Sequence, residues 1–263
     1  LHPQKIKDAS YDVEQVFGTA FRSMAMVDDF LYVAAEYADI AIDVHDPMDP
    51  IITSALPHEN TNVAAFGNLV AVVNSRDIAI YSIADPATLQ LMNLIERDSG
   101  GEGVAFLDQN TLVVSYDDRV WVFDVSDPSS PAKRSEIAIP GGAASEIFIV
   151  DNTAYIACLG NGILIVDLSD PDQPQTIGQV DTHAIATDCY VQDDLMLVAG
   201  NDSGLLVFQR GSHASNNVES SPSIAKVQPA GLEWMPADTT DPKSLSLYKA
   251  DQQSAILDVD YSM

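Results

Sequence analysis

A pattern of about 42 residues recurs along this chain, and a repeat of that length constrains the fold more than any other feature. Its clearest copies read LYVAAEYADIAIDVHDPMDP at 31–50, LVVSYDDRVWVFDVSDPSSP at 112–131 and AYIACLGNGILIVDLSDPDQP at 154–174. Each copy has an apolar run, a tight polar turn, a second apolar run and then Asp-Pro. With divergent copies at 69–86 and 195–210, the equivalent positions are 39, 42, 43 and 42 residues apart, at Asp43, Ser82, Asp124, Asp167 and Gln209.

The apolar runs have the character of strands. RVWVFDV and GILIVDL are short, rich in Val, Ile and aromatic residues, and bounded by Gly, Asn, Asp and Pro. They are apolar at nearly every position, as expected for strands buried on both faces. A degenerate sixth copy places Asp258 at the position equivalent to Asp43, and YDVEQVF at 11–17 has the pattern of a fourth strand without a blade of its own. We therefore predict an all-β, six-bladed β-propeller with four-stranded antiparallel blades, the last closed by the N-terminal strand.

The repeat spans the chain as a single predicted domain, 1–263. The predicted blades cover 22–56, 62–95, 103–139, 145–180 and 186–229, and the sixth combines 231–260 with 11–17. The fifth copy lacks Asp-Pro and continues into the polar stretch GSHASNNVES, which we interpret as a long loop within that blade.

The motif ILIVDLSDPDQP, echoed by VWVFDVSDPSSP and IAIDVHDPMDP, resembles the LVIVD-repeat family of bacterial and archaeal proteins. The resemblance covers nearly the whole chain, with copies one, three and four the strongest. It implies a propeller that is secreted, periplasmic or on the cell surface, and it says little about activity.

The net charge of the chain limits the classes of partner that it can bind. The chain has 39 Asp plus Glu against 12 Lys plus Arg, a formal net charge of -27. So negative a surface repels nucleic acid and anionic lipid, and no apolar run approaches the roughly 18 residues of a spanning helix. We therefore expect no nucleic-acid partner and no direct membrane insertion. A start at Leu1 fits a processed secreted chain or an excised part of a longer one equally.

Two cysteines, Cys158 and Cys189, lie in strand patterns 31 residues apart, without metal-ligand spacing. The sequence leaves open whether they form a disulfide or two small buried side chains.

Aligned first strands bring polar residues to one position around the predicted channel. That position holds Ser23, Asn62, Val104, Glu146, Asp188 and Glu233. Oxygen ligands converging from several blades suit Ca²⁺, so Asn62, Glu146, Asp188 and Glu233 are candidate metal ligands. The alternative is that they hydrogen-bond to neighbouring strands and to channel water. No contiguous calcium-binding loop accompanies them.

The same rim carries His58 and His183, each a candidate general base. The alternative is that each is an ordinary solvated histidine on a surface loop. Candidate partner-binding residues are Glu59 and Glu102 on the rim and Ser212, His213, Asn216 and Asn217 in the long loop. Nucleophile elbows, phosphate loops and zinc-protease motifs are missing from the sequence.

These residues favour a non-enzymatic binding or scaffold protein of the cell envelope or exterior, which contacts a protein or a glycan. One alternative is a Ca²⁺-dependent, lactonase-like hydrolase with its metal in the channel. Another is a structural subunit of a larger envelope assembly.

Overall fold

The computed structural model describes residues 20–97, 102–142 and 144–210, together with the backbone of three further strands at 234–236, 244–248 and 255–260. These parts are built almost entirely from β-strands, and the one helical element described is a single 3₁₀ turn, η1 (Asn201–Ser203). In the described ranges, no helix is long and apolar enough to cross a membrane. The prediction of an all-β chain is confirmed.

Five four-stranded antiparallel sheets follow one another along the chain. The first contains β1 (Phe21–Val27), β2 (Phe30–Ala35), β3 (Ala38–Asp43) and β4 (Ile51–Pro57). The second contains β5 (Asn62–Phe66), β6 (Leu69–Val73), β7 (Asp77–Ser82) and β8 (Gln90–Glu96). The third contains β9 (Val104–Asp108), β10 (Thr111–Tyr116), β11 (Arg119–Asp124) and β12 (Ala132–Ala138).

The fourth sheet contains β13 (Glu146–Val150), β14 (Thr153–Ala157), β15 (Ile163–Asp167) and β16 (Gln175–Val180). The fifth contains β17 (Asp188–Gln192), β18 (Leu195–Ala199), β19 (Leu205–Arg210) and β20 (Trp234–Pro236). A two-stranded sheet pairs β21 (Ser244–Tyr248) with β22 (Ala255–Asp260). In all five larger sheets the strands are ordered as in the sequence.

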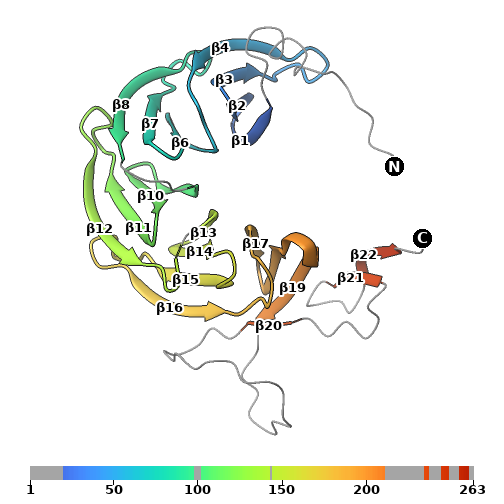
Figure 1. Ribbon diagram of the computed structural model, residues 1–263. Helices are drawn as coiled ribbons and strands as arrows, with labels where there is room; N and C mark the ends of the chain where they lie inside the picture. Colours follow the sequence, from blue (N-terminus) through green and yellow to red (C-terminus); the bar gives the residue numbers. More distant parts are fainter. Residues whose placement is uncertain are drawn as a thin grey trace, which may run out of the picture.

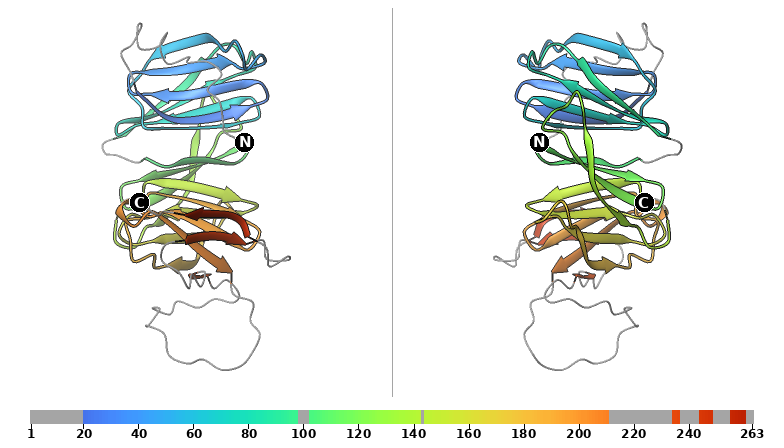
Figure 2. Two further views of the ribbon diagram at one scale, coloured as in Figure 1. Left: turned by 90° about the vertical axis from the view of Figure 1, so that its right-hand side faces the viewer. Right: turned by 90° about the vertical axis from the view of Figure 1, so that its left-hand side faces the viewer.

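The sheets are arranged around an arc, with first strands such as β1, β13 and β17 toward its centre and β4, β8, β12 and β16 along its outside (Figure 1). In side view the strands run from one face of the arc to the other (Figure 2). Turns between second and third strands therefore share one face with the connections between sheets. Hairpins between first and second strands lie on the opposite face.

Burial on both faces explains why the second and third strands are apolar at nearly every position. β2, β3, β6 and β7 are buried at nearly every position. Separate apolar clusters fill each junction between neighbouring sheets, for example Val63, Val70 and Val72 of the second sheet against Tyr32 and Ala34 of the first. A strand between two such clusters has no polar face, which removes the usual two-residue alternation.

The Asp-Pro segment ends the third strand by a repeated turn. Asp124 Oδ1 accepts the N–H of Ser126 at 2.9 Å, and Asp167 Oδ1 accepts that of Ser169 at 2.8 Å. The fourth strand then pairs with a register shift, which lies at the same place in sheets one to four. Side-chain capping and the missing proline N–H together redirect the chain into the outer strand.

Six blades and ring closure are not confirmed. β21 and β22 form only two strands, and residues 11–17, predicted to complete the sixth blade, lie outside the described residues. The boundary after the fifth blade also differs from the prediction, because Trp234 to Pro236 pair with β19 as its fourth strand, whereas the predicted sixth blade begins at 231. The repeat is weakest here, so several short apolar segments fit an outer strand equally well.

Cys158 and Cys189 are both buried free thiols, so the disulfide left open by the sequence does not form. Burial raises the pKa of both thiols, to about 11 for Cys158. They pack as small apolar side chains in the clusters on either face of the fourth sheet.

Candidate functional site

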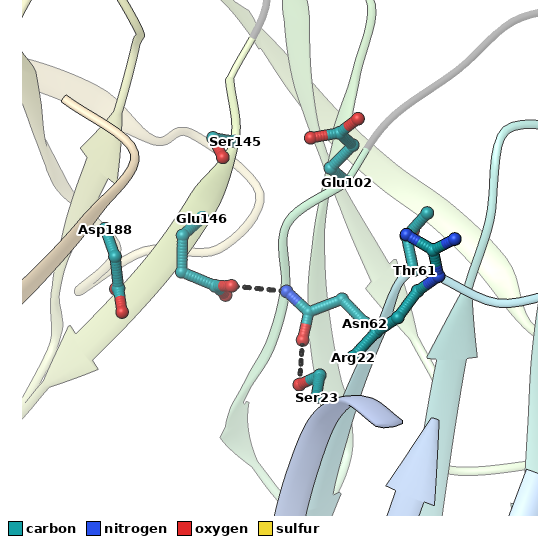
Figure 3. A pocket seen from close by; sticks show the side chains of 8 residues that line it. All are labelled: Arg22, Ser23, Thr61, Asn62, Glu102, Ser145, Glu146 and Asp188. Carbon is teal, nitrogen blue, oxygen red and sulfur yellow. Dashed lines mark hydrogen bonds between the residues drawn. The ribbon is translucent and has the colours of Figure 1, made fainter. Parts of the chain in front are cut away.

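The first strands of the five sheets lie beside one another in chain order, β1 against β5, β5 against β9, β9 against β13 and β13 against β17. Where they begin, they surround an open pocket of about 480 Å³. Its lining side chains are all polar: Arg22, Ser23, Thr61, Asn62, Glu102, Ser145, Glu146 and Asp188 (Figure 3). The structure thus brings Asn62, Glu146 and Asp188 together, as the repeat alignment anticipated.

A hydrogen-bonded chain crosses the pocket floor. Ser23 Oγ donates to Asn62 Oδ1 at 2.5 Å, and Asn62 Nδ2 donates to a carboxylate oxygen of Glu146. Asn62 Oδ1 also accepts the N–H of Val63 at 2.8 Å. Both ends of the Asn62 amide are therefore occupied, and the chain ties the first, second and fourth sheets together (Figure 3).

Gly103, and not Val104, occupies the channel position of the third sheet. Val104 is 3% exposed and packs in the cluster shared with the second sheet. A Cβ on Gly103 would lie 2.8 Å from Ile147 Cγ1 and 3.1 Å from the carbonyl carbon of Glu146. Glycine therefore lets β9 approach β13, and without a side chain there Asn62 reaches across to Glu146. The prediction was wrong by one residue because β9 pairs with β10 through a register shift.

Glu146 carries the strongest electrostatic perturbation in the pocket. Burial raises its pKa to about 7, opposed by hydrogen bonds from the Ile147 N–H and the Asn62 amide. The negative charges of Asp188 and Glu102 add to the rise. Near neutral pH this carboxyl group is therefore shared between its protonated and ionised forms.

Asp188 and Arg22 complete the charges of the pocket. Asp188 Oδ1 accepts the N–H of Cys189 at 2.7 Å, and burial raises the pKa of the Asp188 carboxyl. Arg22 forms an ion pair with Glu36 at 3.1 Å, so a carboxylate already balances its charge. The pocket keeps a net negative character from Glu102, Glu146 and Asp188.

In the described geometry the amide of Asn62 is already hydrogen-bonded at both ends, so its oxygen is not turned toward a cation. The oxygen of Asn62 faces Ser23 and the Val63 N–H, while its nitrogen faces Glu146. No group of three or more His, Cys, Asp or Glu placed to hold a metal is found among the described residues. The fourth candidate ligand, Glu233, lies outside them.

His58 is held between two carboxylates. Its Nδ1 lies 3.0 Å from Asp39 Oδ2, and its Nε2 lies 2.8 Å from Asp77 Oδ1. Burial opposes protonation, but the hydrogen bonds and charges of Asp39 and Asp77 outweigh it and raise the pKa of His58 to about 9. His58 is therefore an imidazolium at neutral pH, with no lone pair to accept a proton, and this geometry argues against a general base.

The other candidates from the sequence do not join this centre. His183 is exposed on the loop before β17 and contacts Asp181. Glu59 is also exposed, and its carbonyl oxygen accepts a hydrogen bond from Asn74, whereas Glu102 does line the pocket. The loop candidates Ser212, His213, Asn216 and Asn217 lie outside the described residues.

Sequence reasoning did not find Asp39 and Asp77, the partners of His58. A signal was present, because both begin the same four-residue string, Asp-Ile-Ala-Ile, at the start of the third strand in copies one and two. A carboxylate at the edge of a buried strand requires a partner. Its recurrence at Asp39 and Asp77 therefore marks both residues as members of a hydrogen-bonded group. Ser145 and Thr61, which also line the pocket, immediately precede first strands and carried no such signal.

Comparisons with known proteins agree with this architecture. The profile of the LVIVD repeat family matches residues 110–136 and 141–182, which cover most of the third and fourth sheets. No curated protein matches the sequence.

Three solved structures illustrate the likeness in fold. A functionally unknown protein from Desulfotomaculum acetoxidans has a TM-score of 0.64 at 16% identity, over 74% of this chain and 67% of that one. A protein from Lactobacillus plantarum has a TM-score of 0.61 at 13% identity, over 70% and 64%. The computationally designed Ika8 protein has a TM-score of 0.56 at 14% identity, over 72% and 58%.

This chain thus spans less than two thirds of the Lactobacillus and Ika8 chains, and identities this low show the fold alone. The matched repeat is associated with β-propeller folds. The chain therefore carries LVIVD repeats within residues 110–182 and has a β-propeller-like repeat fold.

Proposed function

We propose that this protein is a non-enzymatic binding and scaffold propeller whose channel-face pocket receives a basic side chain from a protein partner. The single observation that carries this proposal is the composition of the pocket. Three carboxyl groups, Glu102, Glu146 and Asp188, face one open cavity. Among the described residues that line it, the only basic side chain is Arg22, which is already paired with Glu36.

A lysine or arginine side chain would complement this pocket. It would bring the opposite charge to Glu146, whose ionised form is disfavoured by burial and by like charges. It would also provide N–H donors for Asp188, which accepts one backbone N–H through Oδ1. The net charge of -27 would speed the approach of a basic partner.

We further propose that the ring has six blades, the last completed by residues 11–17. Apolar side chains on the free faces of the end sheets support this. Met24 and Met26 of the first sheet are 61% and 60% exposed, and Tyr190 and Leu205 of the fifth are 50% and 45% exposed. A further blade between the two ends would cover such side chains and remove both open ends of the arc.

A cell-envelope or extracellular location remains part of the proposal, supported by the resemblance to LVIVD-repeat proteins and the acidic composition. Within an envelope assembly, the same pocket would serve as a docking point for a neighbouring subunit. Ser212, His213, Asn216 and Asn217 remain candidate contacts for that partner.

Binding of lysine- and arginine-containing peptides to wild type and to Asp188→Asn tests the pocket. Asp193→Asn is the matched control, because Asp193 follows the opposite end of β17 and loses the same charge. We expect Asp188→Asn to weaken binding about tenfold, as loss of a charge-assisted hydrogen bond would, and Asp193→Asn to leave it within about twofold. Equal weakening by both variants, or preferential binding of neutral oligosaccharides, would reject a basic protein partner.

The calcium-dependent hydrolase stays an alternative prediction. It requires Asn62 to turn away from Ser23 and Glu146 and present its oxygen to the metal. A melting temperature unchanged between EDTA and saturating Ca²⁺ would remove it, because a ligand that binds only the native state must raise stability.

A further inference from the structure

A second group of buried polar side chains lies behind the pocket, in the junctions between the first three sheets. His58 follows the first sheet and bridges Asp39 at the start of β3 to Asp77 at the start of β7. Tyr81 donates its hydroxyl proton to Asp39 Oδ2, and Asn74 Nδ2 donates to Asp77 Oδ1 at 3.0 Å. These polar and charged groups from β3, β7 and the turn before β7 surround the His58 ring.

Arg97 continues this group into the third sheet. It follows the second sheet as His58 follows the first, and both donate a backbone N–H to the turn between the second and third strands. Its guanidinium donates to the carbonyl oxygens of Asn74 and of Asp77, the latter at 3.1 Å, and to that of Ser115 at 3.3 Å. Asp77 therefore contacts His58 through its side chain and Arg97 through its backbone.

The far end of this group reaches the pocket at the third sheet. Ser115 Oγ accepts the N–H of Gly103 at 2.8 Å and that of Glu102 at 3.2 Å. These bonds fix the start of β9, where Gly103 approaches Glu146. The guanidinium of Arg97 thus bonds to the backbone of Ser115, the residue whose hydroxyl holds the start of β9.

The near end reaches the pocket at the second sheet. Only three residues separate His58 from Asn62, and the intervening backbone is tied down. Asn60 Nδ2 donates to the carbonyl oxygens of Ala35 and Ala38, both at 2.9 Å, and the Thr61 N–H donates to that of Val73. His58, Asn60 and Thr61 therefore each anchor the segment that leads into Asn62.

We propose that His58, Asp77 and Arg97 form a positioning network that holds Asn62 and Gly103 where Asn62 can hydrogen-bond to Glu146. Its biological consequence rests on the proposed function, because the network would then determine the shape of the partner site. The network itself concerns only described contacts, and its test needs no ligand.

The junction between the third and fourth sheets lies outside this network and shows which side chain takes the position of His58 there. Ile139 follows β12 as His58 follows β4, and it too bonds to the turn between second and third strands. It is 3% exposed and packs in the apolar cluster between the third and fourth sheets. The position is therefore polar at the two junctions next to Asn62 and Gly103, where His58 and Arg97 occupy it. It is apolar at the junction between the third and fourth sheets, where Ile139 occupies it.

The carboxyl carbon of Glu146, observed by NMR during a pH titration, reports on the network. Burial raises its pKa and the charges of Asp188 and Glu102 add to the rise, whereas the hydrogen bonds from the Ile147 N–H and the Asn62 amide oppose it. Loss of a hydrogen bond to the ionised carboxylate should raise the midpoint by about one pH unit. We expect this rise in His58→Gln and Asp77→Asn, in samples shown to be folded by their thermal unfolding.

Asn62→Ala supplies the reference, and it should raise the midpoint equally. In the double variant His58→Gln/Asn62→Ala the two effects should not add, because both remove the same bond. His45→Gln is the control: His45 also contacts a carboxylate, Asp29, but on the opposite face.

A wild-type midpoint in both folded network variants, or fully additive effects with Asn62→Ala, would overturn the proposal. Arg97→Lys provides a third variant should His58→Gln fail to fold. Failure of the proposed function looks different, because basic peptides would then not bind the pocket while the Glu146 titration still followed His58.

Discussion

Asp39 is a carboxylate placed where the neighbouring strand residues are apolar. It is 1% exposed, and among the described residues only one of its two oxygens has hydrogen-bond partners, His58 and Tyr81. Burying an ionised carboxylate is costly unless a charge and hydrogen bonds compensate it. The imidazolium of His58 therefore provides the main compensation for Asp39.

Removing His58 should consequently destabilise the fold by more than its size suggests. We expect His58→Ala to lower the free energy of unfolding by about 3 kcal/mol at pH 7, because Asp39 is left buried without its counter-charge. Adding Asp39→Asn should recover part of this loss. Denaturant unfolding of the two single variants and the double variant measures the coupling, and purely additive losses would contradict it.

The same contact makes stability depend on pH at the alkaline end. The folded-state pKa of His58, about 9, exceeds its ordinary value of 6.5, so its stabilising effect is complete below about pH 6.5 and is lost as pH rises through 9. The difference in unfolding free energy between wild type and His58→Gln should shrink between pH 7 and pH 10. A constant difference across this range would show that the histidine contributes through packing alone.

Glu146 produces a pH dependence at lower pH. Its pKa rises from 4.5 to about 7 on folding, so the native state binds the proton more tightly and loses stability as pH rises through 7. We expect Glu146→Gln to stabilise the protein by about 2–3 kcal/mol at pH 8 and to change little at pH 4. Thermal unfolding at both pH values measures this. A variant less stable than wild type at pH 8 would show that ionised Glu146 stabilises the fold despite its burial.

At the scale of the strand, Gly103 determines how closely two first strands approach. We expect Gly103→Ala to cost about 1–3 kcal/mol, because its Cβ would be forced against Ile147 and the backbone of Glu146. Gly178→Ala is the matched control in another strand, since its Cβ would meet Ile165 at an ordinary 3.5 Å. Chemical denaturation compares the two, and equal losses would mean that the close approach of β9 and β13 relaxes freely.

Strand identity was predictable because it depends on local composition. Runs such as ILIVD are apolar on both faces, and Asp167 with the following Asp-Pro ends the third strand through contacts between near neighbours. The channel position of Asn62, Glu146 and Asp188 followed from the same period. Gly103 did not, because a register shift between β9 and β10 moves one strand by a residue without changing its composition.

The contacts of His58 could not be predicted from the sequence pattern either. They join residues 19 positions apart on each side, from two different sheets, so they depend on how sheets pack and not on where strands begin. The same holds for Ser115, whose hydroxyl accepts from Gly103 across a hairpin. A periodic pattern aligns equivalent positions, but it does not reveal which side chains interact there. His58 and Arg97 bring charges to the first two junctions between sheets, whereas Ile139 takes the equivalent position at the third.

At the scale of the molecule, the first and fifth sheets differ from the three between them. Each middle sheet packs against a neighbour on both faces, whereas Met24 and Met26 point away from the second sheet and are largely exposed. Apolar surface of this kind is retained where something covers it. The proposed sixth blade would do so from within the same chain.

Substitution of Met24 by glutamate distinguishes a covered face from an open one. If a sixth blade packs there, Met24→Glu should lower the free energy of unfolding by about 2 kcal/mol or more, because a carboxylate would be buried without a partner. Leu91→Glu is the control: Leu91 lies on the outer strand β8 and is 51% exposed, so its substitution should stay within about 0.5 kcal/mol. Equal, small effects in both variants would leave the ring open at the first sheet, because only a face packed against another blade penalises a charge.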